Sequence, residues 1–244
     1  MDWLEELSDL ENRLVIEGNE AAKDFFDTVK SIIEYYNIAI KDKNFDEETE
    51  MFNLFFFQVR NSLMLAFLSV LRLHTIQSHL MLRYALESAV LAGYAIHHSD
   101  RSVFLSINEL GHAIEHKNLK KISKKWIERH FPEYSETIKR HKEIINQYSA
   151  HANIISTYTN MDLSESYVSY KFFDNHSYEI IKSYIWEIGM LSITILEFIH
   201  KASQEKDIIT FQETIEMDLE NFKIESNSLR EQLLNSEVFS KYNI

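Results

Sequence analysis

The clearest helical pattern in this chain is FNLFFFQVRNSLMLAFLSVLRL, residues 52–73. Its apolar side chains recur every three or four residues over about six turns, which places them on one face of an α-helix. The residues of that face are Phe52, Phe56, Val59, Leu63, Ala66, Val70 and Leu73. We therefore expect a long helix with one buried side, and a core that other helices complete.

The same spacing continues outward from this segment in both directions. It is found at residues 25–40, 82–96, 134–148 and 181–198. Each of these segments is long enough for a helix and keeps its apolar residues on one stripe. The sequence therefore predicts an all-α protein, an up-and-down helical bundle in which residues 1–244 form a single domain.

Glycine and proline are scarce, with four glycines and one proline in 244 residues. These two residue types supply most of the backbone geometry of tight turns, so their scarcity favours long helices. Gly93 and Gly189 fall inside the helical patterns, where glycine costs about 1 kcal/mol relative to alanine. We expect each of them to permit the close approach of a neighbouring helix.

A polar insertion at residues 99–132 interrupts the apolar segments. Its amphipathic spacing predicts two short helices, at about residues 102–115 and 118–130. The insertion also contains KNLKKISKK, residues 117–125, the one clearly basic patch in the sequence. This patch offers a local contact for an anion.

The pattern changes again after residue 154. Residues 155–159 and 167–173 are rich in β-branched and aromatic side chains and flank a mostly polar run, which predicts a small β-hairpin. Residues 205–240 predict a long C-terminal helical arm, with Ser226 in its apolar seam. This arm either pairs with another chain or folds back along its own bundle.

The charge and the composition of the chain disfavour or exclude several classes of function. The formal net charge is −13, which disfavours binding to nucleic acid or anionic lipid, since such binding draws on lysine and arginine. The absence of cysteine excludes disulfides, thiolate catalysis and cysteine-based metal sites. The acidic start MDWLEELSDLENRL is not a secretory signal, and charged or polar residues interrupt the most apolar stretches, 54–71 and 184–200. We expect a cytoplasmic protein with no membrane contact.

Short histidine motifs raise the question of a metal site. Glu109 and His112, and likewise Glu197 and His200, have the Glu-x-x-His spacing that places two ligands side by side on a helix in di-iron bundles. The segment HAIEH, residues 112–116, matches a zinc-protease pattern. Pairs and patterns this short are also common on solvated helix faces, so we expect no metal and no cofactor.

The candidate catalytic residues are Arg83, Glu87, Tyr148 and His151. Arg83 and Glu87 are four apart in an otherwise apolar helix, so their charges need partners, either each other or groups on a neighbouring helix. His151 follows the end of the 134–148 helix, where it could act as a general acid or base with Tyr148 beside it. The alternatives are a structural ion pair and a helix end that favours a histidine charge.

Two segments carry a resemblance to a known family. They are HTIQSHLMLRYALESAVLAGYAI, residues 74–96, and YSAHANI, residues 148–154. Together they resemble an uncharacterised family of bacterial helical-bundle proteins with an Arg-x-x-x-Glu helix and a later Tyr/Ser…His segment, distantly similar to the HEPN superfamily. The resemblance covers about residues 50–154. It implies an up-and-down bundle, often dimeric, in a superfamily of metal-independent RNases and inactive binding proteins.

Active HEPN members carry an arginine, usually a polar residue next, and a histidine four to six residues later. Arg72 and His79 have this spacing, but Leu73 replaces the polar residue. At the expected position, Asn146 stands where the arginine should precede His151, so RNase activity would require Arg83 to supply the missing charge. The resemblance thus implies a dimeric interaction or defence-associated protein, with a metal-independent RNase as one alternative. The Glu-x-x-His pairs supply a second alternative, a di-metal carboxylate protein. Expected partners are a second copy and another protein, with RNA disfavoured by the acidic charge.

Overall fold

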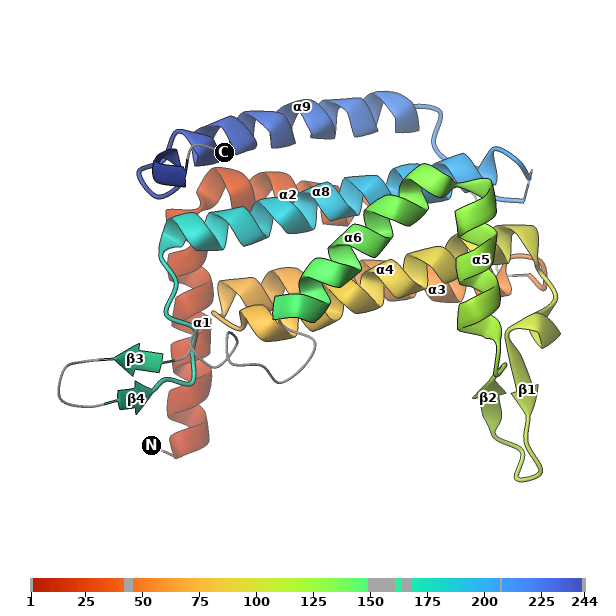
Figure 1. The fold of residues 1–244 in the computed structure, drawn as a ribbon, viewed down its shortest axis with the longest axis horizontal. Helices are drawn as coiled ribbons and strands as arrows, with labels where there is room; N and C mark the ends of the chain where they lie inside the picture. Colours follow the sequence, from red (N-terminus) through yellow and green to blue (C-terminus); the bar gives the residue numbers. More distant parts are fainter. Residues whose placement is uncertain (1, 42–45, 149–160, 164–167, 207, 243–244) are drawn as a thin grey trace.

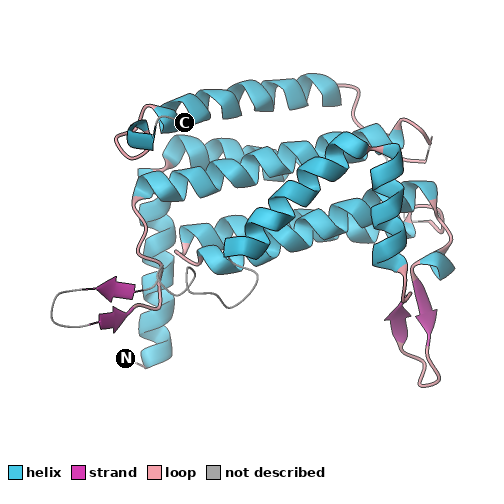
Figure 2. Ribbon diagram, viewed as in Figure 1, coloured by secondary structure: helices cyan, strands magenta, loops and turns pink. Residues whose placement is uncertain are grey.

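The computed structural model describes residues 2–41, 46–148, 161–163, 168–206 and 208–242 (Figure 1). Within these ranges the chain is an all-α bundle of eight α-helices with two small antiparallel hairpins, which confirms the predicted fold class (Figure 2). The helices are α1 (Trp3–Ala21), α2 (Lys23–Tyr35), α3 (Glu50–Leu71), α4 (Thr75–His97), α5 (Leu119–His130), α6 (Pro132–Tyr148), α8 (Tyr178–Ser203) and α9 (Ile215–Leu234). Two 3₁₀ turns, η1 (Arg101–Val103) and η2 (Ser240–Tyr242), complete the helical elements.

Helices α3 and α4 form the most extensive helix pair of the bundle. The chain reverses between them at Leu73, whose φ of 58° lies in the left-handed region. Figure 1 shows α8 lying between this pair and the outermost helix, α9, while α6 crosses α4 diagonally and α1 stands across one end. Helix α8 therefore packs against α2, α4 and α9 and forms the centre of the core.

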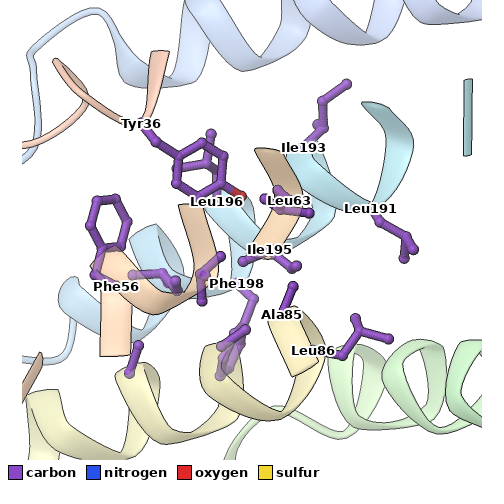
Figure 3. Close-up of a cluster of buried hydrophobic side chains, with 14 of the residues drawn as sticks. Tyr36, Phe56, Leu63, Ala85, Leu86, Leu191, Ile193, Ile195, Leu196 and Phe198 are labelled. Carbon is purple, nitrogen blue, oxygen red and sulfur yellow. The ribbon is translucent and has the colours of Figure 1, made fainter. Parts of the chain in front are cut away.

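The core is one continuous cluster of buried apolar side chains. Figure 3 shows Phe198 of α8 directed toward α4, with Ile195 and Leu196 beside it. Tyr36, the one polar residue labelled in this view, donates a hydrogen bond of 2.7 Å from its hydroxyl to the Ser192 carbonyl oxygen. Because that buried hydroxyl has a partner, its desolvation is largely offset.

Gly93 and Gly189 are close-approach sites, as their positions predict. A Cβ atom on Gly93 would lie 2.5 Å from Cζ of Phe198, and one on Gly189 would lie 2.7 Å from Cγ2 of Val29. Both distances are far below a normal carbon–carbon contact. Glycine at these two positions therefore allows α4 and α2 to pack closely against α8.

The C-terminal arm folds back along its own bundle. Helix α9 buries Ile215, Leu219, Ser226, Leu229 and Leu233. The indole of Trp186 on α8 donates a hydrogen bond of 2.9 Å to the Ser226 carbonyl, and the Tyr35 hydroxyl on α2 donates one of 2.7 Å to Asp218. Of the two alternatives for residues 205–240, the structure shows the intramolecular one.

The first half of the polar insertion is a β-hairpin, so the predicted helix at residues 102–115 is wrong. Strand β1 (Leu105–Ile107) pairs with β2 (Ala113–Glu115), with Ser106 opposite Ile114. The Asn108 side chain accepts hydrogen bonds from the backbone amides of Leu110 and His112, and Gly111 has a φ of 79°. These two residues stabilise a tight reversal that competes with the helix. The second predicted helix, 118–130, is confirmed as α5.

The hairpin predicted after residue 154 is present, but its first strand is shifted. It consists of β3 (Met161–Leu163) and β4 (Val168–Tyr170), so β3 lies inside the run that was expected to form the turn. Residues 155–159, where the first strand was expected, lie outside the described residues. Beyond β4, the buried Asp174 carboxylate accepts a hydrogen bond of 2.5 Å from the Thr75 amide and so caps the start of α4.

Helix α3 is long and apolar enough, by length and composition, to cross a membrane. Half of its most apolar window is buried inside the protein. Three of its large apolar side chains are exposed instead, Leu54, Phe57 and Leu65. The helix therefore has one face in the core and one face with apolar side chains in contact with solvent.

Candidate functional site

A cavity of about 670 Å³ lies between the α3–α4 pair and the α5–α6 pair, and we call it the four-helix cavity. Its apolar lining comes from all four helices and consists of Leu54, Phe55, Val90, Leu91, Ile127 and Ile138. Glu87, Lys142 and Asn146 also line it, on the facing sides of α4 and α6. The volume falls within the range of about 300–1,000 Å³ that is typical of small-molecule sites.

A polar network joins α4 to α6 beside this cavity. Its members are Arg83 and Glu87 of α4 and Lys142 and Asn146 of α6, which we call the α4–α6 seam. The Glu87 carboxylate accepts hydrogen bonds from Nζ of Lys142 at 2.9 Å and from Nε of Arg83 at 3.3 Å. Nη1 of Arg83 donates to Oδ1 of Asn146 at 2.5 Å. The predicted pair therefore exists, and Arg83 also reaches the neighbouring helix.

Glu87 is also approached from α5, where Nζ of Lys120 lies 3.9 Å from its carboxylate. Burial alone would raise the pKa of Glu87, but Lys142, Arg83 and Lys120 lower it below its ordinary value. The Glu87 side chain retains 25% of its exposed surface and that of Arg83 retains 33%, so both remain reachable by solvent. Glu87 is thus an ionised, partly exposed carboxylate held by three cations.

Of the four predicted catalytic residues, only Arg83 and Glu87 have side chains in the part of the chain that the structure describes. Arg83 and Glu87 lie in the seam, whereas Tyr148 is the last residue of α6 and its side chain is outside the described part. His151 also lies outside the described residues. Lys142 was not singled out from the sequence, although one signal was available: a charge beside the inner apolar stripe of α6 that contains Ile138 and Ile145.

The basic patch of residues 117–125 contributes to the same site. From Leu119 onward it forms the N-terminal part of α5, and its Lys120 and Lys124 line the four-helix cavity. Part of the basic patch thus lies at the rim of this cavity, and the anion contact stays a prediction.

A second polar group, the histidine cluster, lies between α4, α6 and α8. It consists of His79, His141, His176, Tyr184 and Glu187. The rings of His79 and Tyr184 are 5.3 Å apart, those of His176 and Tyr184 are 5.7 Å apart, and Nδ1 of His141 is 3.6 Å from Glu187. Burial lowers the pKa of both His79 and His176, which favours their neutral forms.

The Arg72/His79 spacing corresponds to no exposed pair in the described residues. Arg72 is the first residue after α3, and His79 is buried in α4 against Tyr184. His79 therefore belongs to the interior of the bundle and is separated from solvent.

The two Glu-x-x-His pairs lie on different elements. Glu109 and His112 are in the exposed β1–β2 hairpin, which also removes the helical geometry that HAIEH, residues 112–116, would need. Glu197 on α8 pairs with Lys223, and Nε2 of His200 lies 3.6 Å from Glu216. Among the described residues, no group of three or more histidine and acidic side chains is placed to hold a metal ion.

Comparison with protein-family models, with curated proteins and with solved structures finds no match for this chain.

Proposed function

We propose that this chain is a HEPN-like helical-bundle interaction protein, soluble and cytoplasmic, that serves in bacterial defence by binding a ligand or partner at the α4–α6 seam. The observation that carries the proposal is the convergence of Arg83, Lys120 and Lys142, from three helices, on the single carboxylate of Glu87 beside a cavity of about 670 Å³. Such a combination of fixed polar groups and apolar walls is typical of recognition sites.

The protonation state of the seam favours binding over turnover. A general acid or base works best with a pKa near the operating pH, and the pKa of Glu87 is shifted away from that range by its cationic neighbours. Arginine and lysine also stay protonated at neutral pH. The described side chains of the seam therefore supply fixed charges for recognition, and none of them is suited to proton transfer.

A metal-independent RNase is the second candidate, and the Arg83–Asn146 hydrogen bond favours it. Asn146 occupies the position at which active HEPN members would carry arginine, and the guanidinium of Arg83 reaches that position from α4. In this reading, His151 would remove the 2′-hydroxyl proton or protonate the leaving group, while Arg83 would stabilise the charge on the phosphorane.

One experiment separates the two candidates. Wild-type protein and the Arg83→Ala, Glu87→Gln and His151→Ala variants are expressed in a bacterial host, and plaque formation by phages, growth and total RNA integrity are measured. We expect wild-type protein to reduce plaque formation with RNA intact, Arg83→Ala to abolish the protection and Glu87→Gln to alter it, because each changes the charges of the seam. The matched control is Glu136→Gln, an exposed carboxylate on the outer surface of α6.

The outcomes exclude each other. Degraded RNA with wild-type protein, restored in both Arg83→Ala and His151→Ala, would establish the RNase and overturn the binding proposal. Protection that survives Arg83→Ala and Glu87→Gln would remove the seam from the function.

We further propose that the protein forms a homodimer through the outer face of α3. Phe57 and Leu65 on this face are 43% and 50% exposed, and Leu54, at the end of the same stripe, borders the four-helix cavity. Asn61, between Phe57 and Leu65 on the same stripe, is uncharged. In a chain with a net charge of −13, an uncharged apolar stripe is the surface on which two copies can meet with the least repulsion.

Leu65→Glu is expected to convert this dimer to a monomer, because pairing across the two-fold axis would bury two new carboxylates. Light scattering coupled to size exclusion measures the mass. We expect twice the chain mass of 28.9 kDa for wild type and 28.9 kDa for the variant. A wild-type mass of 28.9 kDa at every concentration would contradict the homodimer, and a dimeric Leu65→Glu variant would place the interface elsewhere.

A further inference from the structure

The charges around the four-helix cavity do not cancel. Arg83, Lys120 and Lys142 face one carboxylate, Glu87, so this group carries two excess positive charges. The other charged residues of the lining are Lys124, Lys139, Glu115 and Glu143, which balance in number. The described lining and the adjacent Arg83 are therefore cationic overall, in a chain whose net charge is −13.

The cationic group shares the cavity lining with a set of apolar side chains. These apolar side chains include Leu54 and Phe55 of α3, Leu91 of α4 and Ile127 of α5. The Lys142 side chain is 31% exposed, so its ammonium is partly removed from bulk water, and an anion placed there would interact more strongly than at a fully exposed lysine. A ligand that satisfies both features needs an anionic head and an apolar body.

We infer that the four-helix cavity binds an amphipathic organic anion, with its acidic head at Lys120 and Lys142 and its apolar body against α3 and α5. The inference rests on the proposed function, because it assigns a ligand class to the same site. Charge complementarity selects the head, and the apolar walls select the body. Glu87 holds the two lysines in place and also limits affinity, since its carboxylate competes with the ligand for them.

The test uses three probes with one chain length: decanoate, decan-1-ol and decylamine. Isothermal titration calorimetry with the full chain, below the micelle concentration of each probe, measures their affinities. We expect decanoate to bind most tightly and decylamine most weakly. Lys142→Met keeps the length of the side chain and removes its charge, and we expect it to weaken decanoate binding roughly ten-fold or more, the worth of one charge-assisted hydrogen bond.

Glu87→Gln has the opposite expected effect. It removes the competing carboxylate while leaving an amide of the same shape, so decanoate should bind more tightly than to the wild type. Misfolding cannot produce a gain in affinity, which makes this variant a control for the loss in Lys142→Met. Lys121→Met, on α5 but outside the cavity lining, should leave the affinity for decanoate unchanged.

Three results would overturn the inference. These are equal binding of decanoate and decan-1-ol, unchanged decanoate affinity in both Lys142→Met and Glu87→Gln, and no binding of any probe. None of them bears on the phage and RNA measurements, so the proposed function can stand when the ligand class fails. If a seam variant loses the protection against phages but still binds decanoate as the wild type does, then binding of this ligand class is not what the protection depends on.

Discussion

Phe198→Ala is expected to lower the free energy of unfolding by about 3–5 kcal/mol, the usual cost of removing a buried phenylalanine. The Phe198 ring is fully buried and lies within 5.6 Å, between ring centroids, of both Phe131 and Tyr134. It links α8 to α4 and α6, so the void would open at the point where these helices meet. Urea denaturation followed by circular dichroism measures the loss, which corresponds to a fall in melting temperature of roughly 10 °C.

Gly93→Ala should destabilise the wild-type protein but stabilise the Phe198→Ala variant. In the wild type, the new Cβ would meet Phe198 at 2.5 Å, and overpacking of about 1–3 kcal/mol outweighs the gain in helix propensity of about 1 kcal/mol. In Phe198→Ala the Phe198 ring is gone, and the remaining tight contact, 3.3 Å to Cη2 of Trp126, can be relieved by a small shift of Trp126 toward the void, so alanine at 93 should stabilise the chain. Gly18→Ala is the control, because its Cβ would lie at an ordinary 3.5 Å from Leu71. Additive effects of the two substitutions would contradict this packing account.

The helices could be predicted because their apolar periodicity is unbroken over many turns. Each long segment, such as residues 52–73, repeats one signal often enough that tertiary contacts reinforce it and do not override it. Gly93 and Gly189 were also informative, since glycine inside an apolar helix needs a packing reason, and both glycines face a bulky side chain of a neighbouring helix.

The β1–β2 hairpin shows where such reasoning fails. Three-residue strands repeat their alternating pattern too few times to compete with an apparent helical spacing. The decisive features were single residues, Asn108 as an acceptor for two backbone amides and Gly111 with its positive φ. Both are turn residues, and their spacing, three positions apart, was the available signal.

The candidate site was predictable on one helix only. Arg83 and Glu87 stand out because two charges in an apolar helix need partners. Their partners on other helices, Lys142, Asn146 and Lys120, depend on how α5 and α6 are placed against α4, and the sequence of one helix carries no information on that register. The excess positive charge of the cavity rim follows from this placement and not from composition, which is acidic.

Acidification from pH 7 to pH 5 is expected to lower the stability of the chain, because several histidines are held neutral in the fold. Burial lowers the pKa of His79, His176 and His97 below the ordinary value of 6.5. For His79, the carboxylates of Glu187 and Asp174 oppose this shift and His176 adds to it. The unfolded chain therefore binds more protons than the folded chain, so the stabilisation is complete above about pH 6.5 and is lost as the pH falls below it.

The measurement is the free energy of unfolding in urea at several pH values between 5 and 7. His79→Phe keeps an aromatic ring against Tyr184 and removes the titrating group, so the pH slope should fall by up to about 1.4 kcal/mol per pH unit whatever the change in absolute stability. His112→Gln, on the exposed hairpin, should leave the slope unchanged, because that side chain meets water in both states. Glu87 does not contribute to the pH slope between pH 5 and pH 7, because its lowered pKa gives a stabilisation that is lost only below about pH 4.5. A slope in His79→Phe equal to that of the wild type would show that His79 takes up no proton on unfolding, and the neutral histidine cluster would then not be the source of the acid sensitivity.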